Sequence, residues 1–324
     1  MIAALLPLAM QATTMPPGSD WSVACDNQRY CTAWARVPEG ADSSAYPLVV
    51  LRRAGDAAAV PAIDLPIPVG TAPGTRLTIM VDKRVLAQLI APGGGTGLSL
   101  PFSGALATAL TRGRMLMLTD PDGSVRAQLS LRGLGAVLAE IDAAQLRDGT
   151  RSALVRRGRG NVPPLPPVPE VVVPPADPRP PRVLSPKQLQ ALLGKPPKGC
   201  GPILARGYRL DAAQTLLAIE PLCDTSGVTI LAYVVADKGS PQPATFDAGA
   251  ALPGMPAQQV AGSWDPVRRR IAVLLPATPG HDCGTRRDFA WDGNQFRMVE
   301  ERTVAECRRA TYEITTFHAQ VRTR

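Results

Sequence analysis

Few residues of this chain could perform chemistry, and the densest group of them is His281-Asp282-Cys283. The triplet places a base, an acid and a thiol side by side, which are the residue types of a nucleophilic site. Neighbours in sequence rarely meet in the geometry of a catalytic triad, because their side chains point in different directions. Cys283 also has other cysteines with which it can form a disulfide. The pattern favours a polar loop beside a disulfide over a catalytic centre.

Two further patterns carry little catalytic signal. Glu300-Glu301 is a carboxylate pair of the kind used in glycoside hydrolysis, but adjacent strand residues point to opposite faces. Gly93-Gly94-Gly95 lacks the lysine and the strand–helix frame of a phosphate-binding loop. The chain has only two histidines and no Cys-x-x-Cys spacing. The sequence therefore predicts no catalytic residue, no metal and no cofactor.

Clusters of arginine are the candidates for binding. Arg268-Arg269-Arg270 and Arg286-Arg287 are weak candidates for an anion-binding surface, and Arg156-Arg157 and Arg308-Arg309 would join them if they converge in space. The formal net charge is +8, and its excess lies after residue 150. Such a surface could hold an anionic envelope component, whereas the alternative is a solvated face that maintains solubility. Nucleic acid is an unfavoured partner, because aromatic residues make up only 4% of the chain.

The cysteines bear on the compartment. Cys25 and Cys31 flank the turn-forming Asp26-Asn27, and a hairpin of that size brings opposed Cβ atoms within disulfide reach. Structural disulfides persist mainly in oxidising compartments, so the pair predicts a periplasmic or secreted protein. If the two halves fold independently, three pairings remain for Cys200, Cys223, Cys283 and Cys307. The local pairs Cys200–Cys223 and Cys283–Cys307 are favoured among them.

The first eighteen residues are interpreted as a signal peptide. Met1–Met10 is apolar and no charge precedes Asp20, but a positive n-region is missing and Met10-Gln-Ala12 is an imperfect cleavage signature. The run is too short to span a bilayer, and no later stretch approaches twenty apolar residues. The sequence thus predicts no transmembrane segment.

A proline-rich linker at residues 151–182 divides the chain into domains at 19–150 and 183–324. Ten of the nineteen residues from Pro163 to Pro181 are proline. Proline lacks an amide donor and has a fixed φ, so the stretch is predicted to be an extended spacer.

Short apolar runs bounded by turn residues predict a mainly β fold. In the first half they predict a β-sandwich, with helices at Ala105–Thr111 and Leu134–Leu146. The expected strands there are Tyr46–Leu51, Arg76–Val81, Arg114–Thr119 and Ser124–Leu131.

The second half is predicted to be a disulfide-linked, β-rich (α+β) domain. It begins with a helix that Ser185 caps, Pro186 starts and Gly194 ends. The expected strands are Thr215–Glu220, Val228–Ala236, Arg270–Leu275, Arg287–Trp291 and Gln295–Glu300, the last two joined by a hairpin turn at Asp292-Gly293-Asn294.

Several of these segments together resemble a known family. Trp21, Cys25-Asp26-Asn27, Cys31 and Leu51-Arg-Arg-Ala-Gly55 resemble the opening of an uncharacterised proteobacterial secreted family, the domain of unknown function number eleven seventy-six. The second half resembles it through Pro221-Leu-Cys223, Asp282-Cys283-Gly284, Phe289–Phe296 and Cys307-Arg308. The resemblance implies a periplasmic location and supplies no catalytic residue.

The segment Leu106–Leu138 is similar to the invasion-associated locus B family, in which a helix, two strands and a Ser-Leu-x-Gly step complete a β-sandwich. This chain has Gly93–Leu98 where those proteins usually carry a cysteine pair, so the likeness implies fold more than function. It also implies an envelope-associated protein.

Together these observations predict a non-catalytic envelope protein that binds an anionic component or another envelope protein. The first alternative is a hydrolase of an envelope polymer that uses Asp282 with Asp288 or His281. The second alternative is a purely structural envelope protein. Ligand and oligomeric state do not follow from the sequence.

Overall fold

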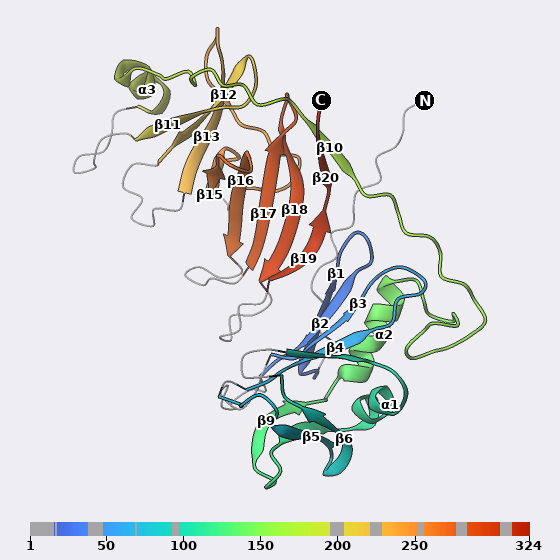
Figure 1. Ribbon diagram of the computed structural model, residues 1–324. Helices are drawn as coiled ribbons and strands as arrows, with labels where there is room; N and C mark the ends of the chain where they lie inside the picture. Colours follow the sequence, from blue (N-terminus) through green and yellow to red (C-terminus); the bar gives the residue numbers. More distant parts are fainter. Residues whose placement is uncertain are drawn as a thin grey trace. The chain divides into compact units, whose positions relative to one another are not determined.

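A computed structural model describes residue 16 and residues 18–37, 48–68, 70–92, 97–194, 204–220, 229–251, 256–276, 284–304 and 313–324. The chain forms two compact units, one of Met1–Pro167 with Ala305–Thr316 and the other of Val168–Val304 with Phe317–Arg324. Strands dominate the described residues, which contain only three helices, and the predicted mainly β fold class is confirmed (Figure 1).

The first unit contains two antiparallel sheets. The five-stranded sheet consists, in hydrogen-bonded order, of β1 (Trp21–Cys25), β2 (Cys31–Ala35), β3 (Val50–Arg53), β4 (Ala62–Pro66) and β7 (Gly97–Pro101). The four-stranded sheet consists of β6 (Arg84–Ile90), β5 (Arg76–Val81), β8 (Met115–Thr119) and β9 (Val125–Ser130).

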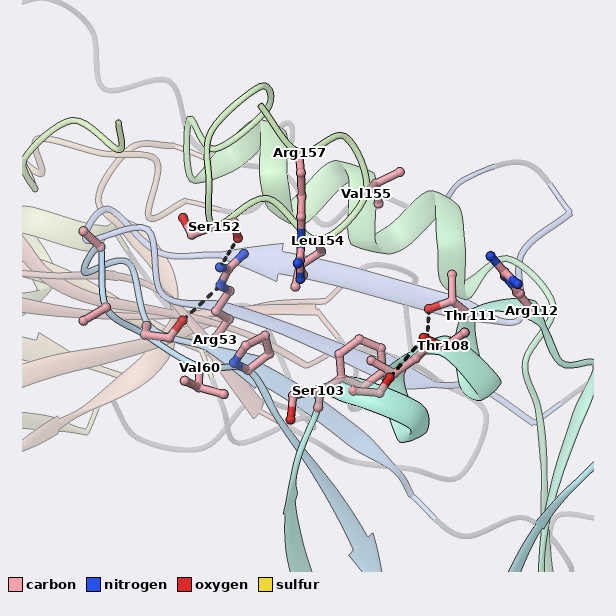
Figure 2. Close-up of a pocket in the computed structure, with 17 residues that line it drawn as sticks. Arg53, Val60, Ser103, Thr108, Thr111, Arg112, Ser152, Leu154, Val155 and Arg157 are labelled. Carbon is pink, nitrogen blue, oxygen red and sulfur yellow. Dashed lines mark hydrogen bonds between the residues drawn. The ribbon is translucent and has the colours of Figure 1, made fainter. Parts of the chain in front are cut away.

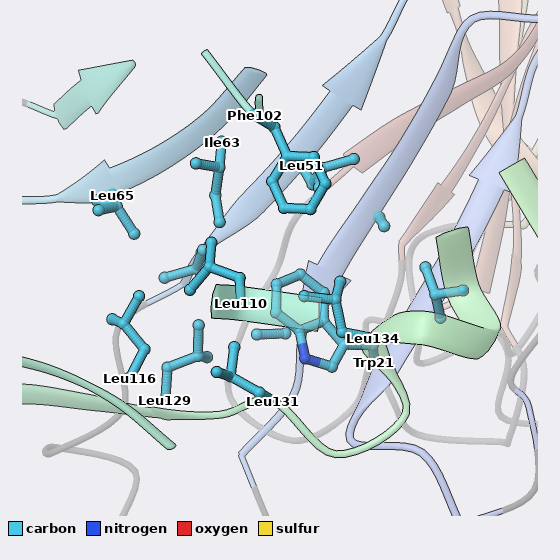
Figure 3. Packing of buried hydrophobic residues seen from close by; sticks show 14 of the residues in the cluster. Trp21, Leu51, Ile63, Leu65, Phe102, Leu110, Leu116, Leu129, Leu131 and Leu134 are labelled. Atoms are coloured by element: carbon cyan, nitrogen blue, oxygen red, sulfur yellow. The ribbon is translucent and has the colours of Figure 1, made fainter. Parts of the chain in front are cut away.

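Both sheets contribute to one apolar core. Leu51 and Ile63 from the first sheet and Leu116 and Leu129 from the second are almost completely buried in the same cluster (Figure 3). The alternating burial of β5 follows from its period-two pattern, because successive strand side chains point to opposite faces. This packing of two sheets on a shared core is the sandwich arrangement that the sequence predicts.

Two helices complete this unit. The helix α1 (Gly104–Arg112) buries Leu110 in the core, and α2 (Leu134–Ala144) buries Leu134, Val137, Leu138 and Ile141. Those four positions recur at the three- and four-residue spacing of one helix face. Both helices begin and end within a few residues of the predicted bounds.

The hairpin β1–β2 carries the predicted disulfide. Cys25 and Cys31 are register partners with Cα atoms 4.0 Å apart, and a disulfide joins them. The Asp26 carboxylate accepts hydrogen bonds from the amides of Gln28 and Tyr30, which stabilise the turn.

A nine-stranded sheet supplies the strands of the second unit, except that residues 313–316 of its last strand belong to the first unit. Its main path consists of β11 (Ala205–Arg209), β12 (Gln214–Ile219), β13 (Thr229–Ala236), β15 (Gln259–Asp265), β16 (Arg270–Pro276), β17 (Gly284–Trp291), β18 (Phe296–Val304) and β19 (Glu313–His318), with β14 (Gln242–Pro243) paired to β13. Two apolar clusters lie in this unit, one on each face of β12. Leu216 belongs to the first cluster and its neighbour Leu217 to the second.

The helix α3 (Pro186–Leu193) confirms the capping prediction in detail. The Ser185 hydroxyl accepts a hydrogen bond from the Gln188 amide, and the Gln188 side chain accepts one from the Ser185 amide. This reciprocal pair is a capping box. Leu189 packs in the cluster that also contains Leu217, so the helix covers one face of the sheet.

The linker is not a spacer throughout, which corrects the prediction for residues 151–182. Its segment β10 (Glu170–Val173) pairs in parallel with β20 (Gln320–Thr323). The four residues between Pro169 and Pro174 keep their amide donors, so they can form the ladder that proline itself prevents. Arg322 Nε also donates to the Glu170 carboxylate at 3.0 Å.

Replacing both Cys25 and Cys31 with alanine is expected to lower the free energy of unfolding of the first unit by about 2 kcal/mol, the chain-entropy value for so short a loop. Urea denaturation followed by tryptophan fluorescence measures the change. An unchanged midpoint in the double variant would show that the bridge contributes nothing to stability.

Acid should weaken the first unit through Asp20. Burial favours a higher pKa for this carboxyl, but hydrogen bonds from Arg132 and Ser130 outweigh it and hold the pKa below its ordinary value. A carboxyl with a lowered pKa in the folded state contributes stability above its unfolded pKa, about 3.9, and loses it as pH falls further. Asp20→Asn should therefore show a smaller fall in urea midpoint between pH 7 and pH 3 than wild type. The control is Glu140→Gln, at an exposed position of α2. Its urea midpoint should fall by as much as that of wild type.

Candidate functional site

A pocket of about 740 Å³ lies in the first unit, a volume typical of small-molecule sites (Figure 2). Three segments form its walls. They are the loop that follows Arg53, one face of α1 with the residues before it, and the stretch from Ser152 to Arg157. Every lining residue belongs to the first unit, so the site is complete within it.

The α1 wall follows directly from helical geometry. The pocket-lining residues of this helix are Gly104, Ala107, Thr108, Thr111 and Arg112, which recur at three- and four-residue spacing. They form a stripe about 12 Å long, at 1.5 Å per residue. The hydroxyls of Thr108 and Thr111 donate back to the carbonyls of Gly104 and Ala107, at 3.0 and 2.7 Å.

A buried ion pair fixes the other two walls. Arg53 and Asp142 each have side chains only 2% exposed, and Arg53 Nη1 lies 3.2 Å from Asp142 Oδ1. The second carboxylate oxygen accepts the amides of Leu154 and Val155 at 2.7 and 2.9 Å. Arg53 donates onward to the carbonyl of Ser152 at 2.5 Å. One carboxylate thus ties the end of β3 to the pocket wall after Thr150.

Arg147 holds the loop after Arg53 in place through hydrogen bonds. Its side chain is fully buried and donates to the carbonyls of Gly55, Asp56 and Ala57 and to the Ser152 hydroxyl. Leu146 has a φ of 55°, and this left-handed turn directly precedes the inward-pointing Arg147.

Gln145 completes the network from the end of α2. Its amide nitrogen donates to the carbonyls of Arg29, Arg53 and Ala54, and its oxygen accepts from Arg147 Nε at 2.8 Å. Gly55 is required here because an added Cβ would lie 2.2 Å from the Gln28 carbonyl oxygen. The loop is therefore held by hydrogen bonds along its whole length.

The electrostatics of the pocket are positive. Burial, followed by the charge of Arg147, lowers the pKa of Arg53 to about 10, with Asp142 opposing the shift and Arg157 adding to it. Arg53, Arg112 and Arg157 line the pocket, whereas none of the lining residues in the described part of the chain is Asp, Glu, His or Cys. The pocket thus suits an anion, and its lining offers no side chain for acid–base chemistry near neutral pH.

The predicted arginine surface of the second unit has a different environment. Arg268 and Arg270 lie beside the carboxylates of Asp288 and Glu300, with Arg268 Nη1 at 3.1 Å from Asp288 Oδ2. Arg302 joins the same group at 3.6 Å from Asp288 and 3.3 Å from Glu300. Asp288 is buried beneath these side chains, although the sequence offered it as a catalytic acid of the alternative hydrolase.

Two of the other predicted arginines, Arg269 and Arg287, do not join that group, whereas Arg286 is the register partner of Arg302. Arg269 donates to the backbone carbonyls of Pro174 and Leu210, and Arg287 is buried against Glu301 with Nε 2.7 Å from its carboxylate. Arg286 is exposed on the same strand. Glu300 and Glu301 bind different arginines, as expected for neighbours on a strand.

Several predicted residues lie outside the described residues. They are the signal peptide up to Met15, Cys200, Cys223, Cys283, Cys307, His281, Asp282, Arg308 and Arg309. Among the residues that are described, no cluster of three or more His, Cys, Asp or Glu could hold a metal. No helix in the described ranges is long and apolar enough to cross a membrane.

No local sequence pattern indicates the pocket. Arg157 belongs to the arginine pair Arg156-Arg157, and Arg53 belongs to the run Leu51–Gly55 that resembles the family. One pattern could have pointed to this loop: the basic residue Arg53 ends a strand, and Gly55 follows two positions later.

Asp142→Asn should lower the free energy of unfolding of the first unit by about 3–5 kcal/mol, because it leaves the buried Arg53 charge without its counter-ion. Denaturation in urea tests this. Asp148→Asn removes a partner of Arg156 on the exposed surface and should cost less than about 1 kcal/mol. Equal losses in the two variants would contradict the role given to the buried pair.

Comparison with known proteins shows similarity to a family, to a curated relative and to a solved structure. The sequence profile of a family described as "Protein of unknown function (DUF1176)" matches residues 18–320. The uncharacterized protein YpfG of Escherichia coli (strain K12) is 27% identical over 345 residues, covering 94% of this chain and 92% of that protein. The crystal structure of invasion associated protein b from Bartonella henselae covers 42% of this chain and 99% of its own, with 21% identity and a TM-score of 0.32.

Both resemblances seen in the sequence therefore recur in these comparisons, although at that TM-score nothing about this chain's fold or function rests on the Bartonella protein. The family match covers nearly the whole chain, from before β1 into β20. This chain belongs to the DUF1176 family of proteins of unknown function.

Proposed function

We propose that this protein is a non-catalytic binding protein of the periplasm or cell surface, and that the pocket of the first unit holds its ligand. The observation that carries the proposal is a preformed pocket whose walls are held by the buried Arg53–Asp142 pair and by Arg147. Rigid walls reduce the entropy lost on binding. The Cys25–Cys31 bridge and the apolar N-terminal run support an exported location.

The lining of the pocket favours binding over hydrolysis. Hydrolysis of an envelope polymer needs a general acid, a base or a nucleophile in contact with the substrate. The described lining residues supply arginines, hydroxyls and apolar side chains but no carboxylate, imidazole or thiol. Ser103, Thr108, Thr111 and Ser152 lack a neighbouring base among these residues, so none of them is an activated nucleophile.

The alternative hydrolase is further disfavoured at Asp288. This residue lies under Arg268, Arg270 and Arg302, which occupy the space that a substrate would need. The anionic partner first expected at these arginines remains a prediction for the second unit.

Thr108→Trp should abolish ligand retention by filling the pocket from an exposed position of α1. The purified protein is incubated with a detergent-free extract of bacterial envelopes, desalted and analysed by native mass spectrometry for a retained mass. Ala105→Trp is the matched control, because Ala105 is also exposed on α1 but does not line the pocket. Wild type and Ala105→Trp should carry the adduct and Thr108→Trp should not. An adduct on all three proteins, or on none, would refute the proposal.

A further inference from the structure

The chemistry of the pocket changes along its length. At one end, Arg157 lies with its guanidinium toward Arg53, and Arg112 lies at the opposite end of the labelled residues (Figure 2). The charge of Arg157 is close enough to Arg53 to lower the pKa of that guanidinium, whereas Arg112 has no such effect among the main causes. The positive charge is therefore concentrated at the Arg53–Arg157 end.

That end carries more cations than anions. Arg53, Arg147 and Arg157 lie around the single buried carboxylate of Asp142, and the only other acid with a main influence on Arg147, Asp56, is exposed. Asp142 already accepts hydrogen bonds from Arg53 and from two backbone amides. An arriving anion would thus meet a field that the protein's own carboxylate does not cancel.

Arg53 supplies charge to this field but little direct contact. Its three donor groups are directed to the carbonyls of Ala59 and Ser152 and to Asp142. Arg157 is exposed, and its Nε donates to the Ala153 carbonyl at 3.1 Å, which leaves its two terminal nitrogens as the donors nearest the pocket. Arg157 is therefore the residue placed to bind an anionic group directly.

Away from this end the lining is mixed, because Thr108, Thr111 and Arg112 are polar. Apolar side chains nevertheless belong to each wall, and they are Leu154 and Val155, Ala107 of α1, and Phe102 with Val60. A ligand that bound through its charge alone would leave this surface in contact with water. The stripe of α1 residues, about 12 Å long, has room for a chain of roughly eight carbon atoms.

We infer that the pocket binds a small molecule in which a carboxylate or phosphate group is attached to a short apolar chain. The anionic group lies at Arg157, in the field of Arg53, and the chain extends along Ala107 and Leu154. This inference rests on the proposed function and specifies the chemistry of the same site. A fatty acid is a ligand of this kind with a carboxylate, and a single-chain lipid phosphate is one with a phosphate. The experiment below distinguishes the two.

The probes are octanoate, octyl phosphate, the uncharged octanamide, and inorganic phosphate. Isothermal titration of the full chain should detect octanoate or octyl phosphate, with octanamide at least about tenfold weaker, because a charge-assisted hydrogen bond is lost. Inorganic phosphate alone should not bind measurably, since it buries no apolar surface. The tighter of the two anionic probes identifies the form of the ligand.

Two arginine variants locate the anionic group. Arg157→Gln should weaken the anionic probe about tenfold and leave octanamide unchanged, because only the charged group contacts this side chain. Arg112→Gln is the matched control at the other end of the pocket and should change affinity by less than about threefold. Both positions are exposed, and thermal melts check that the variants fold.

Three outcomes would overturn the inference: equal affinity for octanamide and octanoate, no effect of Arg157→Gln, or no binding of either anionic probe. If the probes fail while Thr108→Trp still removes the envelope-derived adduct, the ligand class is wrong and the proposed function stands. If Ala105→Trp and Thr108→Trp retain that adduct equally, the proposed function itself fails.

Discussion

A guanidinium group removed from water must find hydrogen-bond acceptors on every side, and Arg147 imposes this requirement on the first unit. It takes its acceptors from the loop after Arg53 and from Ser152. Asp142, on the last turn of α2, and Gln145, just after it, hold neighbouring backbone in the same way. Because a lost partner would leave a buried charge uncompensated, loop, helix end and wall form one cooperative assembly. The shape of the pocket is a consequence of that assembly.

The charges of the arginines are balanced to different degrees in the two units. In the second unit, Arg268, Arg270 and Arg302 surround two carboxylates, so their charges are largely balanced within the sheet. Beside the pocket of the first unit, the buried carboxylate of Asp142 lies among the guanidinium groups of Arg53 and Arg147, and Arg157 adds a further positive charge. Arginine count alone would rank the second unit as the better anion site. The position of the acids reverses that ranking.

Much of the fold follows from local patterns. Arg76–Val81 has the alternation of a half-buried strand and forms β5 with those bounds, and Ser185 with Pro186 marks the start of α3 correctly. Two of the strands that sequence reasoning missed lack such patterns. β6 is an edge strand with most side chains exposed, and β11 (Ala-Arg-Gly-Tyr-Arg) is largely polar. The pocket was missed because its parts are joined by contacts 89 to 99 residues apart, which no local pattern encodes.

The pairing of β10 with β20 joins residues 150 positions apart, such as Glu170 and Gln320. A growing chain that has just produced β10 therefore carries an apolar Val-Val-Val segment with no neighbour for most of the synthesis of this unit. Closing so long a loop is slow, and unpaired strand edges associate readily with other chains. The prolines on both sides of the segment lack amide donors and limit how far such a mistaken pairing can extend. The prolines are therefore expected to limit mistaken pairing of the nascent chain, besides joining its two units.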